Sequence, residues 1–330
     1  MPAPNKSQQL KLLDEVRQYL RLHHYSIHTE RAYADWIVRF VHFHNMRSCD
    51  DLLPPEPKIE AFLTHLAVNK NAAPATQNQA MNALVFLYKR VLNLSMDGSI
   101  NAIHADKKVN VPVVMTREEV AAVLSLLNGT PQLITKLLYG SRFRVMEAVR
   151  LRVKDVDFGI KQITVRSGKG DKNRITIFPI SLAPLLQNHL ARVKTLHQQD
   201  LAQGHGEVYW PHALSRKYPR ADKEWGWQYV FPARDLSVDP RSGITRRHHV
   251  DPSLINKAIK IAARRAGLNK NISAHTFRHS FATHLLQRGT GIRTIQQLLG
   301  HNNLATTMIY THLLQQGAQA VPSPLDGLGV

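Results

Sequence analysis

Apolar residues recur every three or four positions over most of this chain, and that spacing limits it to a fold built mainly from helices. One stripe contains Leu12, Val16 and Leu20, and a second runs from Tyr33 to Phe40. Prolines at positions 54, 55, 57 and 74 introduce two further helical patterns. The first part of the chain is therefore predicted to be a small module of four or five helices.

The helical pattern stops between Asn93 and Val113, where Gly98, polar residues and Pro112 replace it. A new pattern begins at Thr116 and Glu119, whose spacing is that of a capping box at the start of a helix. We therefore expect a helical domain over residues 1–95, a linker over 96–113 and a second domain over 114–330.

The second domain combines helices with one hairpin. Segments 162–166 and 174–177 alternate apolar and polar residues around a glycine-containing turn at 167–171, which predicts two antiparallel strands. Helical patterns follow at 182–196, at 254–266 and from His275 onward, without the regular strand and helix alternation of a parallel sheet. The predicted fold class is mainly α with a small antiparallel β-sheet (α+β).

The charge of the chain suggests its partner. Lysine and arginine number 43 against 24 acidic residues, a formal net charge of +19 with the 18 histidines neutral. Because phosphates release counterions when such cations neutralise them, this excess favours a nucleic acid as the ligand. A solvated basic surface, or binding to an anionic membrane face, is the alternative.

Cysteine usage and hydropathy exclude other classes. The single cysteine, Cys49, rules out an internal disulfide framework, and adjacent histidines such as His23 and His24 lack the third ligand of a zinc site. With neither an export-type apolar segment at the N-terminus nor an apolar run long enough to span a membrane, we expect a cytoplasmic, nucleoid-associated bacterial protein.

The C-terminal third carries residues suited to phosphate chemistry. His275 and Arg278 are three residues apart on a predicted helix, so one phosphate could meet both. Cleaving a phosphodiester without a metal requires fixed cations on its nonbridging oxygens, and a phenol such as Tyr310 could be the nucleophile if neighbouring groups help it ionise. Taken singly, these residues could equally be packed tyrosines or core histidines.

Their order along the chain resembles that of the tyrosine recombinase family. The motifs are an arginine within residues 139–155, a lysine in the hairpin turn, the sequence HTFR at 275–278, LLGH ending at 301, and a tyrosine at 310. The resemblance implies a SAM-like core-binding domain and a catalytic domain that form a C-shaped DNA clamp. The catalytic residues it implies are Arg144, Lys169, His275, Arg278, His301 and Tyr310.

Each of these residues has an implied role. By similarity, Arg144 and Arg278 bind the scissile phosphate, and Lys169 protonates the departing 5′ oxygen. His275 and His301 assist proton transfer and phosphate binding. No cofactor and no metal is implied.

One position departs from the family pattern. Glu147 matches an acidic residue that supports the site, but Arg142 stands where the family usually has a glycine. If the backbone there has a positive φ, arginine would cost on the order of 1 kcal/mol and could displace Arg144. Alternatively, Arg142 adds a phosphate contact. A catalytically silent DNA-binding protein therefore remains one alternative function.

An aromatic and basic segment at 201–250 contains three of the four tryptophans. Such side chains can stack on bases that have left a helix and bind their backbone, although they could simply anchor the segment. The segment resembles the insertion that distinguishes integron integrases from other tyrosine recombinases. The candidate DNA contacts are Trp210, Trp227, Pro240, Arg246, Arg247, His248 and His249.

The resemblance implies a site-specific recombinase that integrates and excises gene cassettes. Its substrates would be duplex attachment sites and folded single-stranded cassette sites, cleaved through a 3′-phosphotyrosine. A homo-tetramer on DNA and a monomer in its absence are expected, with the tail after Thr311 either an intersubunit peg or a frayed end. A phage integrase or chromosome-dimer resolvase is the alternative of the same chemistry.

Overall fold

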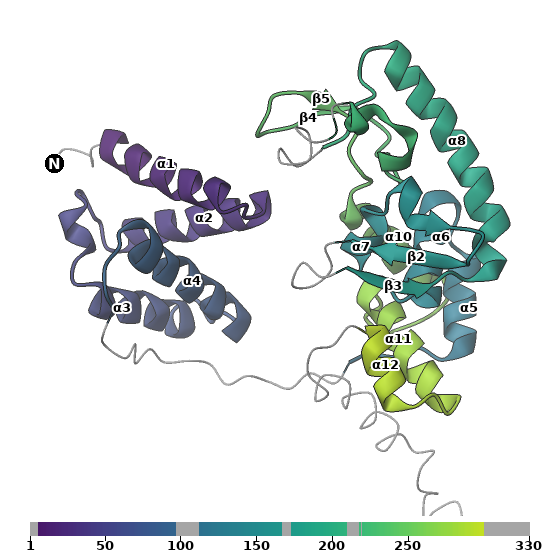
Figure 1. The fold of residues 1–330 in the computed structure, drawn as a ribbon. Helices are drawn as coiled ribbons and strands as arrows, with labels where there is room; N and C mark the ends of the chain where they lie inside the picture. Colours follow the sequence, from purple (N-terminus) through teal and green to yellow (C-terminus); the bar gives the residue numbers. More distant parts are fainter. Residues whose placement is uncertain (1–5, 97–111, 167–172, 210–217, 219, 300–330) are drawn as a thin grey trace, which may run out of the picture. The chain divides into compact units, whose positions relative to one another are not determined.

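The computed structural model describes residues 6–96, 112–166, 173–209, 218 and 220–299 of the 330 (Figure 1). Contacts between residues divide the chain into two compact units, Met1–Asn110 and Val111–Val330. Each unit has its own apolar core and is described by itself.

The first unit is a small helical module, as its apolar periodicity predicted. Pro55 and Pro74 occupy the first turns of α3 and α4, where a missing amide hydrogen costs no hydrogen bond. Ser26 caps α2 by accepting a hydrogen bond from the amide of Thr29 at 3.1 Å. The helices are α1 (Lys6–Leu22), α2 (Ile27–Phe43), α3 (Pro55–Val68) and α4 (Pro74–Phe86), which continues as a π-helical turn over Leu87–Val91.

Aromatic side chains fill the core of this module. Phe40 is fully buried and makes edge contacts with Phe62 and Tyr88. The hydroxyl of Tyr88 donates to the carbonyl of Leu52 at 2.7 Å, which satisfies the one polar atom of that buried ring.

The second unit is built around a three-stranded antiparallel sheet in the order β1-β2-β3. The register pairs Ile163 with Thr176 and Val165 with Arg174, so Arg174 and Thr176 project from the same face of β3. A second, two-stranded sheet lies in the segment 201–250. The strands are β1 (Val156–Asp157), β2 (Gln162–Val165), β3 (Arg174–Ile177), β4 (Ser237–Val238) and β5 (Thr245–Arg246).

Helices make up most of the rest of the second unit. Thr116 and Glu119 form the predicted capping box, with hydrogen bonds of 3.2 and 2.8 Å between their side chains and each other's amides. The helices are α5 (Arg117–Ser125), α6 (Gly129–Gly140), α7 (Val145–Val149), α8 (Ala183–Ala202), α10 (Pro252–Arg265), α11 (Ala274–Gln287) and α12 (Ile292–Leu299).

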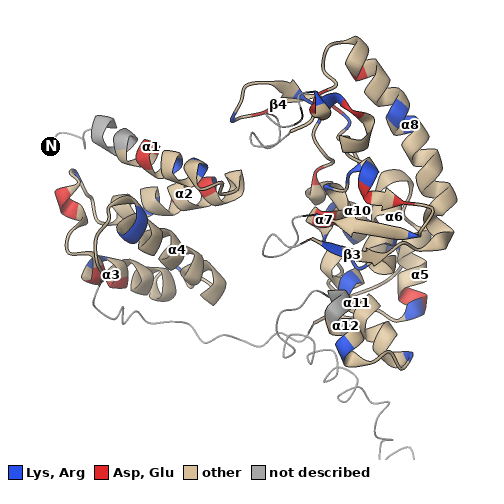
Figure 2. Ribbon diagram, in the orientation of Figure 1, with Lys and Arg blue, Asp and Glu red and all other residues tan. Residues whose placement is uncertain are grey.

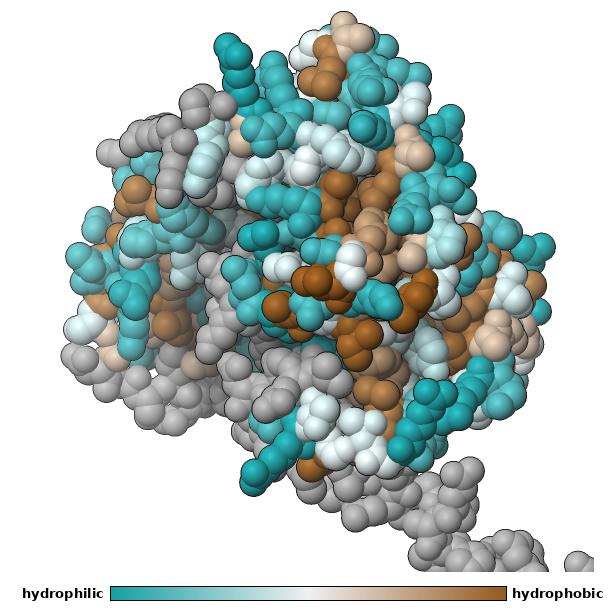
Figure 3. Space-filling view, turned by 45° about the vertical axis from the view of Figure 1, so that its right-hand side comes forward, coloured by the Kyte–Doolittle hydropathy of each residue, from teal (hydrophilic) through white to brown (hydrophobic). Residues whose placement is uncertain are grey.

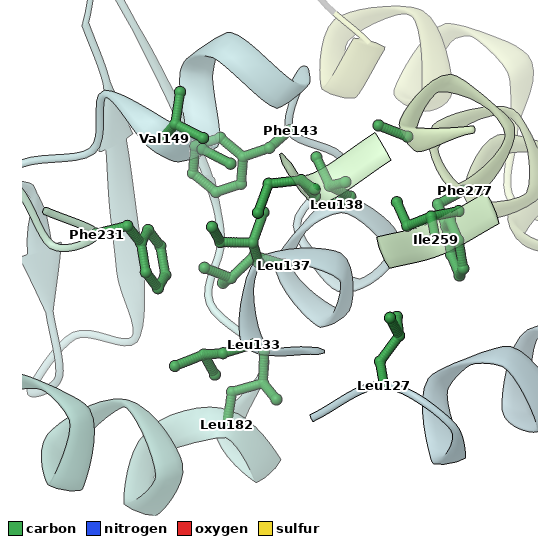
Figure 4. Packing of buried hydrophobic residues seen from close by; sticks show 14 of the residues in the cluster. Leu127, Leu133, Leu137, Leu138, Phe143, Val149, Leu182, Phe231, Ile259 and Phe277 are labelled. Atoms are coloured by element: carbon green, nitrogen blue, oxygen red, sulfur yellow. The ribbon is translucent and has the colours of Figure 1, made fainter. Parts of the chain in front are cut away.

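Helix α6 lies at the centre of the second core. Its Leu133, Leu137 and Leu138 point into a cluster that includes Phe231 and Phe277, from segments far apart in the sequence (Figure 4). Helix α6 packs against α11, and the hydrogen bond from Arg278 of α11 to the carbonyl of Arg142 joins the turn that follows α6 to α11.

Helix α8 is longer than the sequence pattern predicted, since it continues to Ala202 rather than stopping near residue 196. Its last turns bury polar residues instead of apolar ones. His197 is within 3.0 Å of the carbonyl of Lys223, and Asp200 is paired with Arg247. Apolar periodicity therefore could not reveal this part of the helix.

The surface of the molecule mixes charged and apolar side chains (Figure 3). Among the described residues, no helix is both long and apolar enough to cross a bilayer. Exposed large apolar residues on and around β3 are Ile160, Ile175, Ile177, Ile180 and Leu185.

Candidate active site

Arg144 is held in place at the start of α7 by a carboxylate one turn later. Glu147 accepts hydrogen bonds from the amide of Arg144 at 2.8 Å and from its Nη1 at 2.6 Å. The carboxylate thereby caps the helix and orients the guanidinium, whose side chain remains 25% exposed. Arg144 consequently presents fixed donors at an accessible position.

The same carboxylate binds a second arginine from β3. Arg174 donates to both oxygens of Glu147, at 2.9 and 2.7 Å, in a bidentate pair. Burial by itself raises the pKa of Glu147. The hydrogen bonds from Arg174 and from the amide of Arg144 outweigh that effect and lower the pKa to about 2. Glu147 is therefore ionised at neutral pH and ties α7 to β3.

Arg278 enters the site from α11. Its guanidinium donates to the carbonyl of Arg142, and its Nη1 lies 4.0 Å from Oε2 of Glu147. Its side chain is only 5% exposed. Arg278 and Arg144 are thus brought to the same carboxylate.

His275 lies one turn before Arg278 on α11. Desolvation lowers its pKa, and the positive charges of Arg278 and Arg144 lower it further. The neighbouring His279 is more strongly affected, because burial and the charges of His275 and Arg278 lower its pKa to about 4. Both imidazoles are therefore neutral at physiological pH, and a neutral imidazole can accept or relay a proton.

Arg142 has a backbone conformation that side chains rarely adopt, with φ of +60°. This is the positive value anticipated for a position where the family usually has glycine. Its side chain is 1% exposed, and its three guanidinium nitrogens have no hydrogen-bond partner. Burial lowers the pKa of Arg142, and the charges of Arg278 and Arg174 bring it to about 8.

The site as a whole has an excess of positive charge. In the described part of the chain, guanidinium groups from α7, β3, α11 and the turn after α6 face the single carboxylate of Glu147. Figure 2 shows basic residues on β3 and α11 and the acidic residue of α7. Fixed cationic donors beside a neutral imidazole can bind an oxyanion and stabilise charge that develops on it.

Arg174 was not among the site residues inferred from sequence. The signal that could have identified it is the alternation of β3, which puts Arg174 on the same inward face as the buried Thr176. An arginine on the inward face of a strand requires an acidic partner, and Glu147 provides it.

Several of the sequence-inferred residues lie outside the described residues. These are Lys169, Trp210, His301 and Tyr310.

In the segment 201–250, Trp227 is half-buried beneath two cations. The ammonium of Lys154 lies over its ring, and the guanidinium of Arg166 is 5.9 Å from the ring centroid. Desolvation and the charge of Arg166 lower the pKa of Lys154 to about 8. Arg152 fixes the backbone, donating to the carbonyls of Trp227 at 2.7 Å and of Tyr209 at 3.3 Å.

The histidines of this segment differ in exposure. His248 is exposed, whereas His249 is buried, and their ring centroids are 4.0 Å apart beside Tyr229. Burial and the charge of His249 lower the pKa of His248 to about 4. Pro240 is exposed in the turn between β4 and β5.

The two arginines of this segment are engaged in ion pairs. Arg246 pairs with Asp239 at 3.2 Å. Arg247 forms a bidentate pair with Asp200 of α8, with Nη2 at 2.7 Å from Oδ1, and donates to two backbone carbonyls. Their guanidinium groups are consequently less accessible than His248 and Pro240, with side chains 15% and 13% exposed.

Comparison with known protein families matches both units. Residues 113–316 match the model described as phage integrase family, and residues 12–97 match the model of the phage integrase N-terminal SAM-like domain. The match to the first model includes Arg144, Glu147, Arg174, His275 and Arg278.

Individual relatives agree with the family models. An integrase/recombinase of Escherichia coli is 44% identical over 319 residues, covering 97% of this chain and 94% of the relative. Tyrosine recombinase XerA of Thermococcus kodakarensis is 30% identical over 316 residues, covering 94% and 92%. The structure of XerH recombinase bound to its difH substrate has a TM-score of 0.57 at 19% identity, covering 96% and 89%, which shows the same fold. The chain therefore belongs to the phage integrase family of tyrosine recombinases, enzymes that cleave and rejoin DNA.

Proposed function

We propose that this recombinase is of the integron integrase type. It exchanges DNA strands through a 3′-phosphotyrosine on Tyr310, and it integrates and excises gene cassettes at duplex attachment sites and at folded single-stranded sites. Residues 1–95 act as the core-binding domain, 96–113 as the linker and 114–330 as the catalytic domain.

The observation that carries the chemical part is the meeting of Arg144 and Arg278 at the carboxylate of Glu147, with His275 close enough to both arginines for their charges to lower its pKa. Arg144 and Arg278 bind the nonbridging oxygens of the scissile phosphate. Glu147 acts as a positioning residue, because it holds Arg144 in one orientation, and the ion pair with Arg174 in turn fixes Glu147.

The reaction conserves the energy of the phosphodiester. The phenol oxygen of Tyr310 forms a bond to phosphorus while the bond to the 5′ oxygen breaks, and Lys169 supplies the proton to that oxygen. The freed 5′ hydroxyl of the partner strand then attacks the phosphotyrosine and releases Tyr310. His275 and His301 transfer protons and bind the phosphate. No metal is required in these steps.

The integron assignment depends on the segment 201–250. A half-buried tryptophan flanked by Lys154 and Arg166, together with exposed His248 and Pro240, offers ring faces and cations to an extrahelical base. Recognition by stacking tolerates varied base sequences, which suits variable cassette sites. Exchange between two sites requires four cleavages, so we propose a homo-tetramer on DNA that assembles from monomers.

A nicked suicide substrate tests the chemistry. The wild-type protein should form a covalent adduct with DNA because the nicked strand diffuses away and prevents religation, whereas Tyr310→Phe should form none. Tyr25→Phe, which removes a hydroxyl from the first unit, is the control and should retain the adduct. An adduct on Tyr310→Phe would overturn the assignment of the nucleophile, and DNA binding without an adduct in wild type would identify a silent protein.

The integron assignment has its own test. Trp227→Ala should weaken binding to a folded single-stranded cassette site by about 10- to 100-fold, the loss of one stacked base, and leave binding to a duplex site nearly unchanged. Trp225→Ala is the matched control, since Trp225 belongs to the same short helix but lies beside His197 of α8. Unchanged binding to both DNAs would favour a phage-type or chromosome-dimer recombinase, and an equal loss on both would mean that the variant is misfolded.

A further inference from the structure

Unpaired polar atoms gather in one place beside the catalytic arginines. Seven buried side-chain atoms of the described residues have no hydrogen-bond partner, and five of them belong to Ser141, Arg142 and Arg174. They are Oγ of Ser141, Nε of Arg174 and all three nitrogens of the Arg142 guanidinium. Ser141 and Arg142 adjoin in sequence, and a hydrogen bond of 2.9 Å from Thr176 to the carbonyl of Ser141 joins them to the strand of Arg174.

Within the described residues, the one acidic group that acts on Arg142 is shared with other arginines. The charged groups that act on it are Arg278, Arg174 and Arg144, which repel it, and Glu147, which attracts it. Glu147 is already bound by Arg144 and by both terminal nitrogens of Arg174. A buried guanidinium without a partner is strongly unfavourable, and an anion from outside would supply the acceptors that its nitrogens lack.

Arg142 lies next to Arg278, one of the two arginines that we assign to the scissile phosphate. Arg278 donates to the carbonyl of Arg142, and its charge acts on the Arg142 guanidinium, so the two groups are close enough to share one anion. Among the neighbouring site residues, Arg144 keeps a quarter of its side chain exposed and His275 is exposed, so solvent reaches this part of the site.

We propose that Arg142 adds an oxyanion-binding site to the catalytic site. Its guanidinium and the unpaired donors of Ser141 and Arg174 together bind one oxyanion. In the DNA-free protein the ligand is a small tetrahedral anion such as inorganic phosphate, and on DNA it is the scissile phosphodiester. Arg142 is then an additional phosphate-binding residue at a position that departs from the family. The inference rests on the proposed function in one respect, because it assumes that the scissile phosphate binds at this site.

Thermal unfolding of the full chain without DNA tests the anion site. Inorganic phosphate, compared with sodium chloride at equal ionic strength, should raise the midpoint of the wild-type protein saturably. Arg142→Met keeps the length and the Cβ atom but removes the charge, and it should lose most of this shift. Arg192→Met removes the same charge from an exposed position on α8 and should keep the shift.

A second variant keeps the test decisive if Arg142→Met does not fold. Arg142→Gly removes the charge together with the strain at φ of +60°, so it should have a higher midpoint than wild type in chloride alone and little response to phosphate. A wild-type midpoint that phosphate raises no more than chloride would overturn the proposal. A phosphate shift that persists in both Arg142 variants would overturn it as well.

DNA binding gives an independent readout. If Arg142 contacts the scissile phosphate, the slope of log K against log salt for duplex DNA should be smaller by about 0.9 in Arg142→Met, the loss of one phosphate contact. An unchanged slope would overturn the DNA part of the proposal. Failure of wild type to form a covalent adduct would contradict the proposed function but leave the phosphate titration unaffected, so the two failures are distinguishable.

Discussion

At Glu147 a single carboxylate orders guanidinium groups from two different elements. Its side chain is 6% exposed and binds Arg144 of the turn before α7 and Arg174 of β3. Because both partners are buried or half-buried, removing the negative charge leaves two cations without compensation. The geometry of the phosphate site and the stability of the second unit therefore depend on the same side chain.

Glu147→Gln keeps the size of the side chain but removes its charge. We expect unfolding of the second unit to become about 3 kcal/mol easier and the cleavage rate to fall about 100-fold, because Arg144 loses its fixed orientation. Denaturant unfolding and single-turnover cleavage measure the two effects. Glu207→Gln is the control, since Glu207 forms an exposed pair with Lys223 at 3.3 Å and should matter little.

The same carboxylate predicts a pH dependence. The pKa of Glu147 is about 2 in the folded protein, below its ordinary value of 4.5. The carboxylate of Glu147 therefore binds a proton more tightly in the unfolded chain than in the folded protein. The contribution of Glu147 to stability is complete above pH 4.5 and is lost as the pH falls toward 2. Wild type should lose stability over that range more steeply than Glu147→Gln. Parallel acid-unfolding curves for the two proteins would contradict this.

At the scale of elements, the sequence predicted those helices and strands that bury apolar residues at regular spacing. The helices of the first unit and the hairpin of β2 and β3 follow from apolar periodicity, and they were predicted correctly. The last turns of α8 were missed because they bury His197 and Asp200, whose partners lie far along the chain. Arg174 was missed for the same reason, since its partner is 27 residues away.

The end of α8 also anchors the segment 201–250. Asp200→Asn would leave the Arg247 side chain, which is 13% exposed, without its ionic partner. We expect the free energy of unfolding to fall by about 3 kcal/mol. Hydrogen exchange should increase across residues 231–250 and change little in α6. Asp14→Asn, at an exposed pair with Arg17 on α1, should change stability by less than about 0.5 kcal/mol. Equal effects of the two substitutions would contradict the anchoring role.

At the scale of the whole molecule, each unit has an apolar core of its own. The core of the second unit runs from Met115 to Phe277, and that of the first from Leu12 to Tyr88. We expect a fragment of residues 114–330 to unfold cooperatively on its own, as measured by circular dichroism, and a fragment of residues 1–95 to do the same. A fragment that aggregates or unfolds without a transition would show that the units depend on each other.

Arg152 has a consequence for how chains of this kind change over evolutionary time. One side chain binds the carbonyls of Tyr209 and Trp227, and its guanidinium lies 3.7 Å from the ring centroid of Tyr229. One side chain therefore binds both ends of the stretch between positions 209 and 227. A lineage that keeps Arg152 keeps both ends of this stretch attached, and one that loses Arg152 releases both at once, with no change to the residues of the catalytic site.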